Sequence, residues 1–174
     1  MARIENQIQA HENRLAPAEE DAVLIPYNLE DALNNMVLKV DGNPGYPGEA
    51  PQNTCLSLLD AKWCGKKCED EDFCLVYRFS TPIIIRGYGI RSANDCPNRD
   101  PLVWSVFAEE GGEKLIHQVD GTDGETELWG DDRFKMVTFR LENPVETDYF
   151  ELKIHKKQES EEEHCQINEV VLLQ

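Results

Sequence analysis

Basic residues are scarce in this sequence. Its 17 lysines and arginines stand against 34 aspartates and glutamates, which gives a formal net charge of -17. An acidic surface repels phosphate backbones and anionic lipid headgroups, so nucleic acids and membranes fit poorly as partners. Apolar runs such as Ile83–Ile85 are too short to span a bilayer. Much of the charge can simply serve solubility, while a basic protein patch, a neutral sugar or a cation fits as a partner.

An apolar leader is also missing after Met1, because Ile4 is followed at once by the polar residues Glu5, Asn6 and Gln7. We therefore expect a cytoplasmic protein, or an extracellular one if the chain is a fragment of a secreted protein. The six cysteines leave three states open: buried reduced thiols, up to three disulfides, or thiolate ligands of zinc. They are Cys55, Cys64, Cys68, Cys74, Cys96 and Cys165.

Motifs of catalysis are absent too. The chain has no Gly-x-Ser-x-Gly elbow, no glycine loop that could cradle a phosphate, and no His-Glu-x-x-His metal helix. Its many carboxylates carry little information in so acidic a chain, and none stands in an obviously apolar setting. A binding module is favoured over an enzyme.

The 174 residues suit one domain preceded by a short segment. In residues 1–22, Ile4, Ile8 and Leu15 recur at spacings of four and seven, which predicts an amphipathic helix that ends near Pro17. From residue 23 to residue 174 the pattern is that of β-structure. The predicted division is therefore an N-terminal helical or flexible segment, 1–22, and a β-domain, 23–174.

Alternation of apolar and polar residues predicts the strands. In Phe73–Phe79 every second residue is apolar, the period of a half-buried strand. Further strands are expected at Met36–Val40, Ile83–Ser92, Val103–Ala108, Lys114–Val119, Phe134–Leu141, Tyr149–His155 and Ile167–Leu173. Turn formers separate them at Glu110–Gly112, Asp120–Gly124 and Asn143–Pro144. Short strands without long intervening helices predict an all-β protein, an antiparallel β-sandwich or jelly roll.

One loop carries a specific resemblance. The run Ser92–Trp104, SANDCPNRDPLVW, resembles the strand–loop–strand signature of the discoidin or coagulation-factor C-type domains, which have a galactose-binding-like fold. The opening loop 43–53, the Lys62-Trp63 pair and the closing stretch Ile167–Leu172 are similar to that family as well. The resemblance covers roughly residues 36–174 and implies a ligand-binding sandwich.

The same run also makes physical sense as a rigid loop. Asn94 and Asp95 can bond backbone amides, and the Arg99 guanidinium can bridge carboxylates or carbonyls. Pro97 and Pro101 stiffen the chain. The residues Asn94 and Arg99 are thus either parts of a self-satisfied clamp or contacts to a ligand.

Asp60 and Glu169 match the positions at which many members of that family hold a calcium ion. The resemblance implies a structural Ca²⁺ at these two residues, since calcium takes six to eight oxygen ligands. The sequence departs from the family here, because Ala61 and Lys62 alone separate Asp60 from Trp63. The family's glycine and threonine are missing from this turn, and oxygen ligands are missing with them.

A sugar site needs an aromatic platform and directed polar groups. Trp129, in a Gly/Asp-rich stretch, and Tyr46, between prolines and glycines, are the candidate platforms. Trp63 and Trp104 are expected in the core. We predict a non-catalytic module, monomeric by preference, that binds glycans or glycoconjugates through loops at one end of the sandwich. The alternative is an intracellular protein–protein interaction domain that uses the acidic surface.

Overall fold

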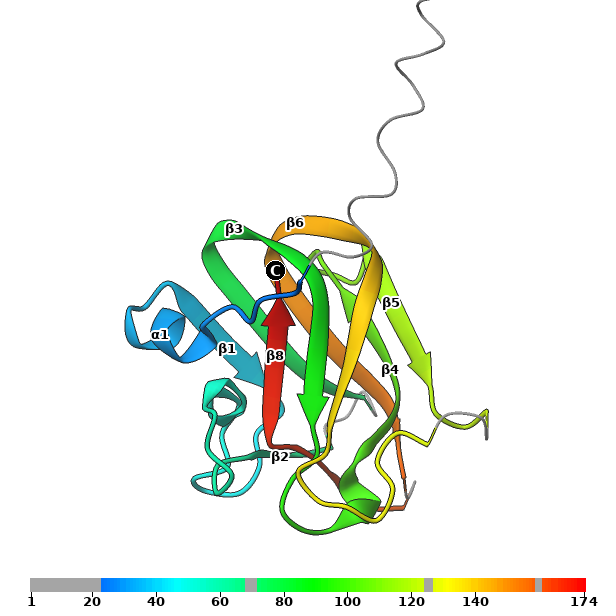
Figure 1. Cartoon of the computed structure of the whole chain (residues 1–174). Coiled ribbons are helices and arrows are strands. Elements are labelled where there is room, and N and C mark those ends of the chain that lie inside the picture. Colours follow the sequence, from blue (N-terminus) through cyan, green and yellow to red (C-terminus); the bar gives the residue numbers. More distant parts are fainter. Residues whose placement is uncertain (1–22, 68–71, 124–126, 159–160) are drawn as a thin grey trace, which may run out of the picture.

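Two long strands organise the fold. In the computed structural model of the chain, which describes residues 23–67, 72–123, 127–158 and 161–174, β3 spans Phe73–Arg91 and β6 spans Met136–Lys157. They pair antiparallel with each other, and both arch over one end of the domain (Figure 1). The sequence pattern predicted a break in each of them, at Pro82 and at Asn143–Pro144. The chain bends there instead, with register shifts in the pairing, and each strand continues.

The bend places each half of β3 and β6 in a different layer of a β-sandwich. The first half of β3 pairs with β1, the second half of β6 pairs with β4, and β5 adds to the far side of β4. The second half of β3 pairs with β8, which builds the other layer. A separate two-stranded sheet joins β2 to β7. The bounds are β1 Leu38–Gly42, β2 Trp63–Lys66, β4 Pro101–Phe107, β5 Leu115–Asp120, β7 His164–Ile167 and β8 Glu169–Leu173.

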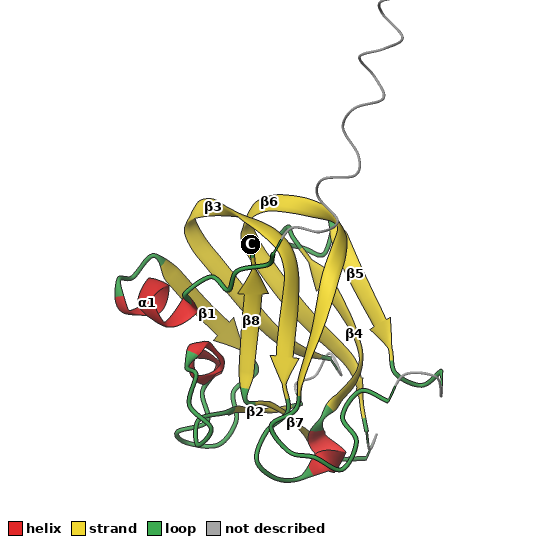
Figure 2. Ribbon diagram, viewed as in Figure 1, coloured by secondary structure: helices red, strands yellow, loops and turns green. Residues whose placement is uncertain are grey.

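Helices are few and short among the described residues (Figure 2). They are α1 Leu29–Asn34 and the 3₁₀ turns η1 Pro51–Cys55 and η2 Pro97–Arg99. The Asn28 side chain caps α1 by accepting the Asp31 N–H at 2.9 Å. The helix predicted in residues 1–22 lies outside the described residues. None of the helices in the described part of the chain is long and apolar enough to cross a membrane.

The core follows the alternation read from the sequence. Phe73, Leu75, Tyr77 and Phe79 of β3 are all buried, and the paired stretch of β6 buries Phe150, Leu152 and Ile154. Trp63 and Trp104 are fully buried, as expected. Burial of each such side chain contributes about 1.5–3 kcal/mol to the free energy of folding. The core therefore holds the two layers together.

The connecting loops gather at the end of the sandwich away from the two arches (Figures 1 and 2). We call this the loop end. It comprises the described parts of the loops 43–62, 92–100, 121–135 and 158–163, together with the small β2–β7 sheet. The opposite bend end carries the arches of β3 and β6 and the 108–114 turn. Asn168, between β7 and β8, is where the chain passes from the small sheet into the main one.

Candidate functional site

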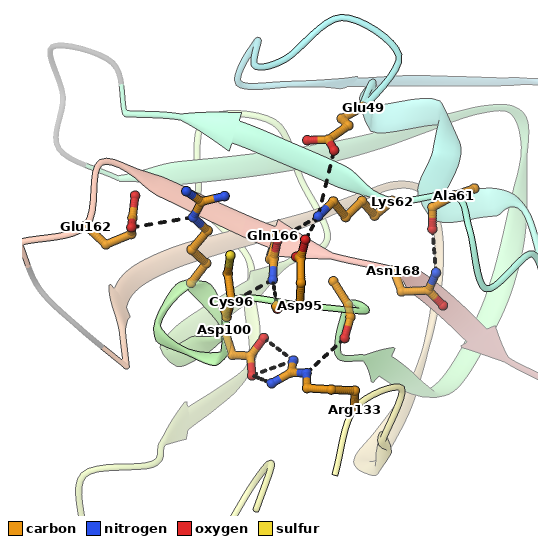
Figure 3. A network of polar contacts seen from close by, with 12 residues as sticks. Glu49, Ala61, Lys62, Asp95, Cys96, Asp100, Arg133, Glu162, Gln166 and Asn168 are labelled. Carbon is orange, nitrogen blue, oxygen red and sulfur yellow. Dashed lines mark hydrogen bonds and ion pairs between the residues drawn. The ribbon is translucent and has the colours of Figure 1, made fainter. Parts of the chain in front are cut away.

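A buried lysine joins three segments of the loop end (Figure 3). Lys62 Nζ donates to Asp95 Oδ1 at 2.7 Å and to Gln166 Oε1 at 3.2 Å, and lies 3.7 Å from Glu49 Oε1. Burial alone would raise the pKa of Asp95, but the hydrogen bond and charge of Lys62 hold that pKa below its usual value. The lysine therefore ties the opening loop to the 92–100 loop and to β7.

Arg133 forms a second clamp on the 92–100 loop. Arg133 donates from both terminal nitrogens to the carboxylate of Asp100 at 2.7–2.8 Å, and from Nε to the Ala93 carbonyl at 3.0 Å. Asp100 is fully buried, and its burial raises the pKa of the carboxyl despite the charge of Arg133. Gln166 adds hydrogen bonds to the carbonyls of Asp95 and Cys96. The donors Lys62, Arg133 and Gln166 therefore fix the loop from outside it, whereas Arg99, which the sequence interpretation placed in a clamp within the loop, pairs with Glu162.

A partly exposed cluster surrounds Glu162. Its carboxylate lies 3.5 Å from Arg99 Nε, accepts from Asn98 Nδ2 at 3.3 Å, and accepts the His164 N–H at 3.3 Å. The ring Nδ1 of His164 lies 3.2 Å from the same carboxylate. Burial raises the pKa of Glu162, but the hydrogen bonds from His164 and the charge of Arg99 outweigh it, so the pKa lies below the usual value.

Tyr46 completes this cluster with an aromatic face. Its ring stacks on the ring of His164, with centroids 4.9 Å apart and planes inclined by 16°. The tyrosine is 48 % exposed, so its outer surface is open to a ligand. We call the set Tyr46, Asn98, Arg99, Glu162 and His164 the Tyr46 platform. It combines a flat apolar surface with a carboxylate, a guanidinium and an amide.

Two of the four ligand-binding residues predicted from the sequence, Tyr46 and Arg99, meet in the platform. Asn94 lies on the same 92–100 loop as Arg99, but it is exposed and does not belong to the platform. The expectation that Trp129 offers an exposed stacking surface is wrong, because the residue is only 2 % exposed. Its indole N–H donates to the Pro101 carbonyl at 2.6 Å and its ring packs near Trp104, so the Gly/Asp-rich stretch turns it inward.

Sequence reasoning missed Glu162 and His164. Glu162 stands in the acidic stretch Gln158–Glu163, whose composition is typical of a solvated loop. The loop does connect β6 and β7, yet it turns one of its carboxylates back toward η2. No local signal separates Glu162 from its acidic neighbours, because two of its partners, Asn98 and Arg99, come from a distant loop.

A cleft of about 540 Å³ lies beside η2. We call it the η2 cleft. Asn98 belongs to both the Tyr46 platform and this cleft. The lining also includes Leu102, Glu127, Leu128, Asp131 and Gln158. The cleft thus places apolar walls beside amides and carboxylates, immediately next to the platform.

The residues at the implied calcium position do not fit that ion. Glu169 accepts from Ser57 Oγ at 2.8 Å and pairs with Arg91 at 3.2 Å. The Asn168 amide donates to the Leu58 carbonyl at 3.0 Å and to the Ala61 carbonyl (Figure 3). Calcium needs oxygens that are free to face it, whereas the Glu169 carboxylate is engaged by Ser57 and Arg91 and the two carbonyls accept the Asn168 amide.

Asp60, the other predicted ligand, is exposed to solvent. Within the described ranges, no group of three or more His, Cys, Asp or Glu side chains is placed to hold a metal. We therefore derive no role for a metal ion.

The described cysteines, which exclude Cys68, carry free thiols. Burial raises the pKa of Cys55 to about 12, and burial, with the nearby Glu49 charge, raises that of Cys64 to about 11. Cys165 is fully buried, and this burial raises its pKa well above the usual value. Such thiols are inert at neutral pH, which agrees with the first of the three cysteine states considered above.

Comparisons with known proteins agree on the fold. Neither a protein-family model nor a curated protein matches the sequence. The family 32 carbohydrate-binding module of Clostridium perfringens NanJ, solved with galactose, superposes with a TM-score of 0.66 at 8 % identity, covering 87 % of this chain and 100 % of that one. The chain has the galactose-binding-like β-sandwich fold.

Two further structures are similar. A family 32 module from Clostridium perfringens, solved with GalNAc-β-1,3-galactose, has a TM-score of 0.62 at 9 % identity and covers 85 % of this chain and 99 % of that one. A fucolectin from striped bass serum has a TM-score of 0.60 at 12 % identity and covers 86 % of this chain and 49 % of that one. At such identities the likeness concerns the fold, and the ligand has to be argued from the loop end.

Proposed function

We propose that this chain is a non-catalytic module that binds glycans through its loop end, with Tyr46 as the stacking surface. The observation that carries the proposal is the half-exposed Tyr46 ring beside Glu162, Arg99 and Asn98. A sugar offers an apolar C–H face and a rim of hydroxyls. The ring suits the face, and a carboxylate, a guanidinium and an amide suit the rim.

The clamps behind the platform support this proposal. Lys62 and Arg133 hold the loops around η2 in one arrangement without a ligand. Because the loops are already ordered, a ligand loses little binding free energy to ordering them. This matters for a small ligand, whose total binding free energy is small. The two Clostridium perfringens modules of the same fold were solved with galactose and with a GalNAc–galactose disaccharide, so galactose-type sugars are the first ligands to test.

The test is calorimetric titration of the full chain with galactose and N-acetylgalactosamine, followed by a glycan array. Replacing Tyr46 by alanine should weaken binding about tenfold, because a stacked ring contributes about 1.5 kcal/mol. Leu115→Ala is the matched control, since Leu115 is also 48 % exposed but begins β5 at the bend end. It should bind as the wild type does.

Two results would count against the proposal. If Tyr46→Ala and the wild type bind sugar equally well, the platform is not the site. If the folded wild type binds no sugar on the array or in the titration, the glycan function is wrong. The acidic protein-interaction alternative would then be favoured.

A further inference from the structure

Four basic side chains at the loop end are already engaged with carboxylates of the same end. Lys62 bonds Asp95, Arg133 bonds Asp100, and Arg99 pairs with Glu162 (Figure 3). Lys66 pairs with Glu163 in the same way. An anionic ligand could recruit one of these cations only by displacing its carboxylate. For the buried Asp100 that exchange would leave a desolvated charge without a partner.

Carboxylates, by contrast, are in surplus around the η2 cleft. Glu127 and Asp131 line it, and both are exposed. In the described part of the chain neither forms an ion pair. The nearby Lys135 ammonium bonds the backbone carbonyl of Glu127, at 3.3 Å, and not its carboxylate. The concave part of the loop end therefore presents uncompensated negative charge, in agreement with the net charge of -17.

We propose that the loop end selects glycans by charge: it binds sugars that carry an amine more tightly than neutral sugars, and neutral sugars more tightly than uronic, sialylated or sulfated ones. The inference rests on the proposed glycan function. Because Asn98 belongs to both the Tyr46 platform and the η2 cleft, a sugar on the platform brings its substituents, or the next unit of an oligosaccharide, over Glu127 and Asp131. An ammonium is attracted there and a carboxylate is repelled.

The size of the effect follows from Coulomb's law. Two carboxylates about 7 Å from the ligand charge, in water at physiological ionic strength, should make an amino sugar bind about fivefold more tightly than the matching uronic acid. The neutral sugar should lie between them. Because the carboxylates are exposed, the spread should widen at about 20 mM salt and nearly vanish at about 500 mM.

The experiment is calorimetric titration of the full chain with galactose, galactosamine and galacturonic acid at the two salt concentrations, below neutral pH so that the amine is protonated. The double variant Glu127→Gln/Asp131→Asn should bind the three sugars with nearly equal affinity. The matched control is Glu109→Gln/Glu146→Gln, which removes the same charge from exposed positions at the bend end. It should keep the wild-type order.

The outcomes separate this inference from the proposed function. If no sugar binds, the glycan function itself is refuted, and the inference with it. If galactose binds but galacturonic acid binds as tightly or more tightly, only the selection by charge is overturned. If the bend-end control loses the order as fully as the loop-end variant does, the preference comes from the overall charge of the protein, and its assignment to the η2 cleft is wrong.

Discussion

Replacing Arg133 by methionine should destabilise the domain strongly while leaving its core unchanged. The substitution keeps most of the aliphatic stem but removes every hydrogen bond to the Asp100 carboxylate and the bond to the Ala93 carbonyl. Asp100 has no exposed surface, so water cannot take over those bonds. The carboxylate would remain buried and charged, or would have to take up a proton.

The magnitude follows from that burial. Removing one partner of a buried ion pair costs about 3–5 kcal/mol, and the 18 % exposure of the Arg133 side chain places this case at the lower end. For a domain of this length about 3 kcal/mol lowers the melting temperature by about 6–12 °C. The loss should shrink as the pH falls, because protonation of Asp100, whose pKa is already raised by burial, removes the uncompensated charge.

The assay is thermal and urea unfolding followed by circular dichroism and tryptophan fluorescence. Asp100→Leu/Arg133→Met should recover more than half of the loss, since apolar residues often replace a buried ion pair without penalty. Lys66→Met, which breaks an exposed pair with Glu163, should change stability by less than about 1 kcal/mol. The reasoning fails if Arg133→Met melts within about 2 °C of the wild type, or if the double variant is no more stable than the single one.

Two other predictions concern ions and pH. Adding calcium or a chelator should leave the melting temperature unchanged within about 1 °C. The reason is that Arg91 and Ser57 engage Glu169, and the Asn168 amide donates to the neighbouring carbonyls. A calcium-dependent rise of several degrees would contradict this prediction. Asp95 and Glu162 have pKa values below their usual ones. Their contribution to stability is therefore complete above about pH 4.5 and is lost as the pH falls through the lowered values. Urea midpoints measured against pH should fall less steeply in acid for Asp95→Asn/Glu162→Gln than for the wild type, and parallel curves would refute the assignment.

The sandwich itself could be predicted from the sequence because burial in a half-exposed strand repeats every two residues. Phe73–Phe79 shows this period, and its apolar positions are the buried ones. The resemblance of Ser92–Trp104 to a known family narrowed the sandwich to the galactose-binding-like fold. Where prolines interrupt the pattern at Pro82 and Pro144, local signals indicated turns. The tertiary pairing of β3 with β6 carries both strands through these bends.

Local patterns determined which loops are rigid and which aromatic residues were worth considering, but they could not determine which of those residues faces solvent. Trp129 lies inside because its N–H reaches the Pro101 carbonyl, whereas Tyr46 stays half exposed on His164. Glu162 looked like any other carboxylate of an acidic loop. Only the tertiary structure brings it to Arg99 and Asn98, because such contacts depend on how distant loops meet at one end of the sandwich.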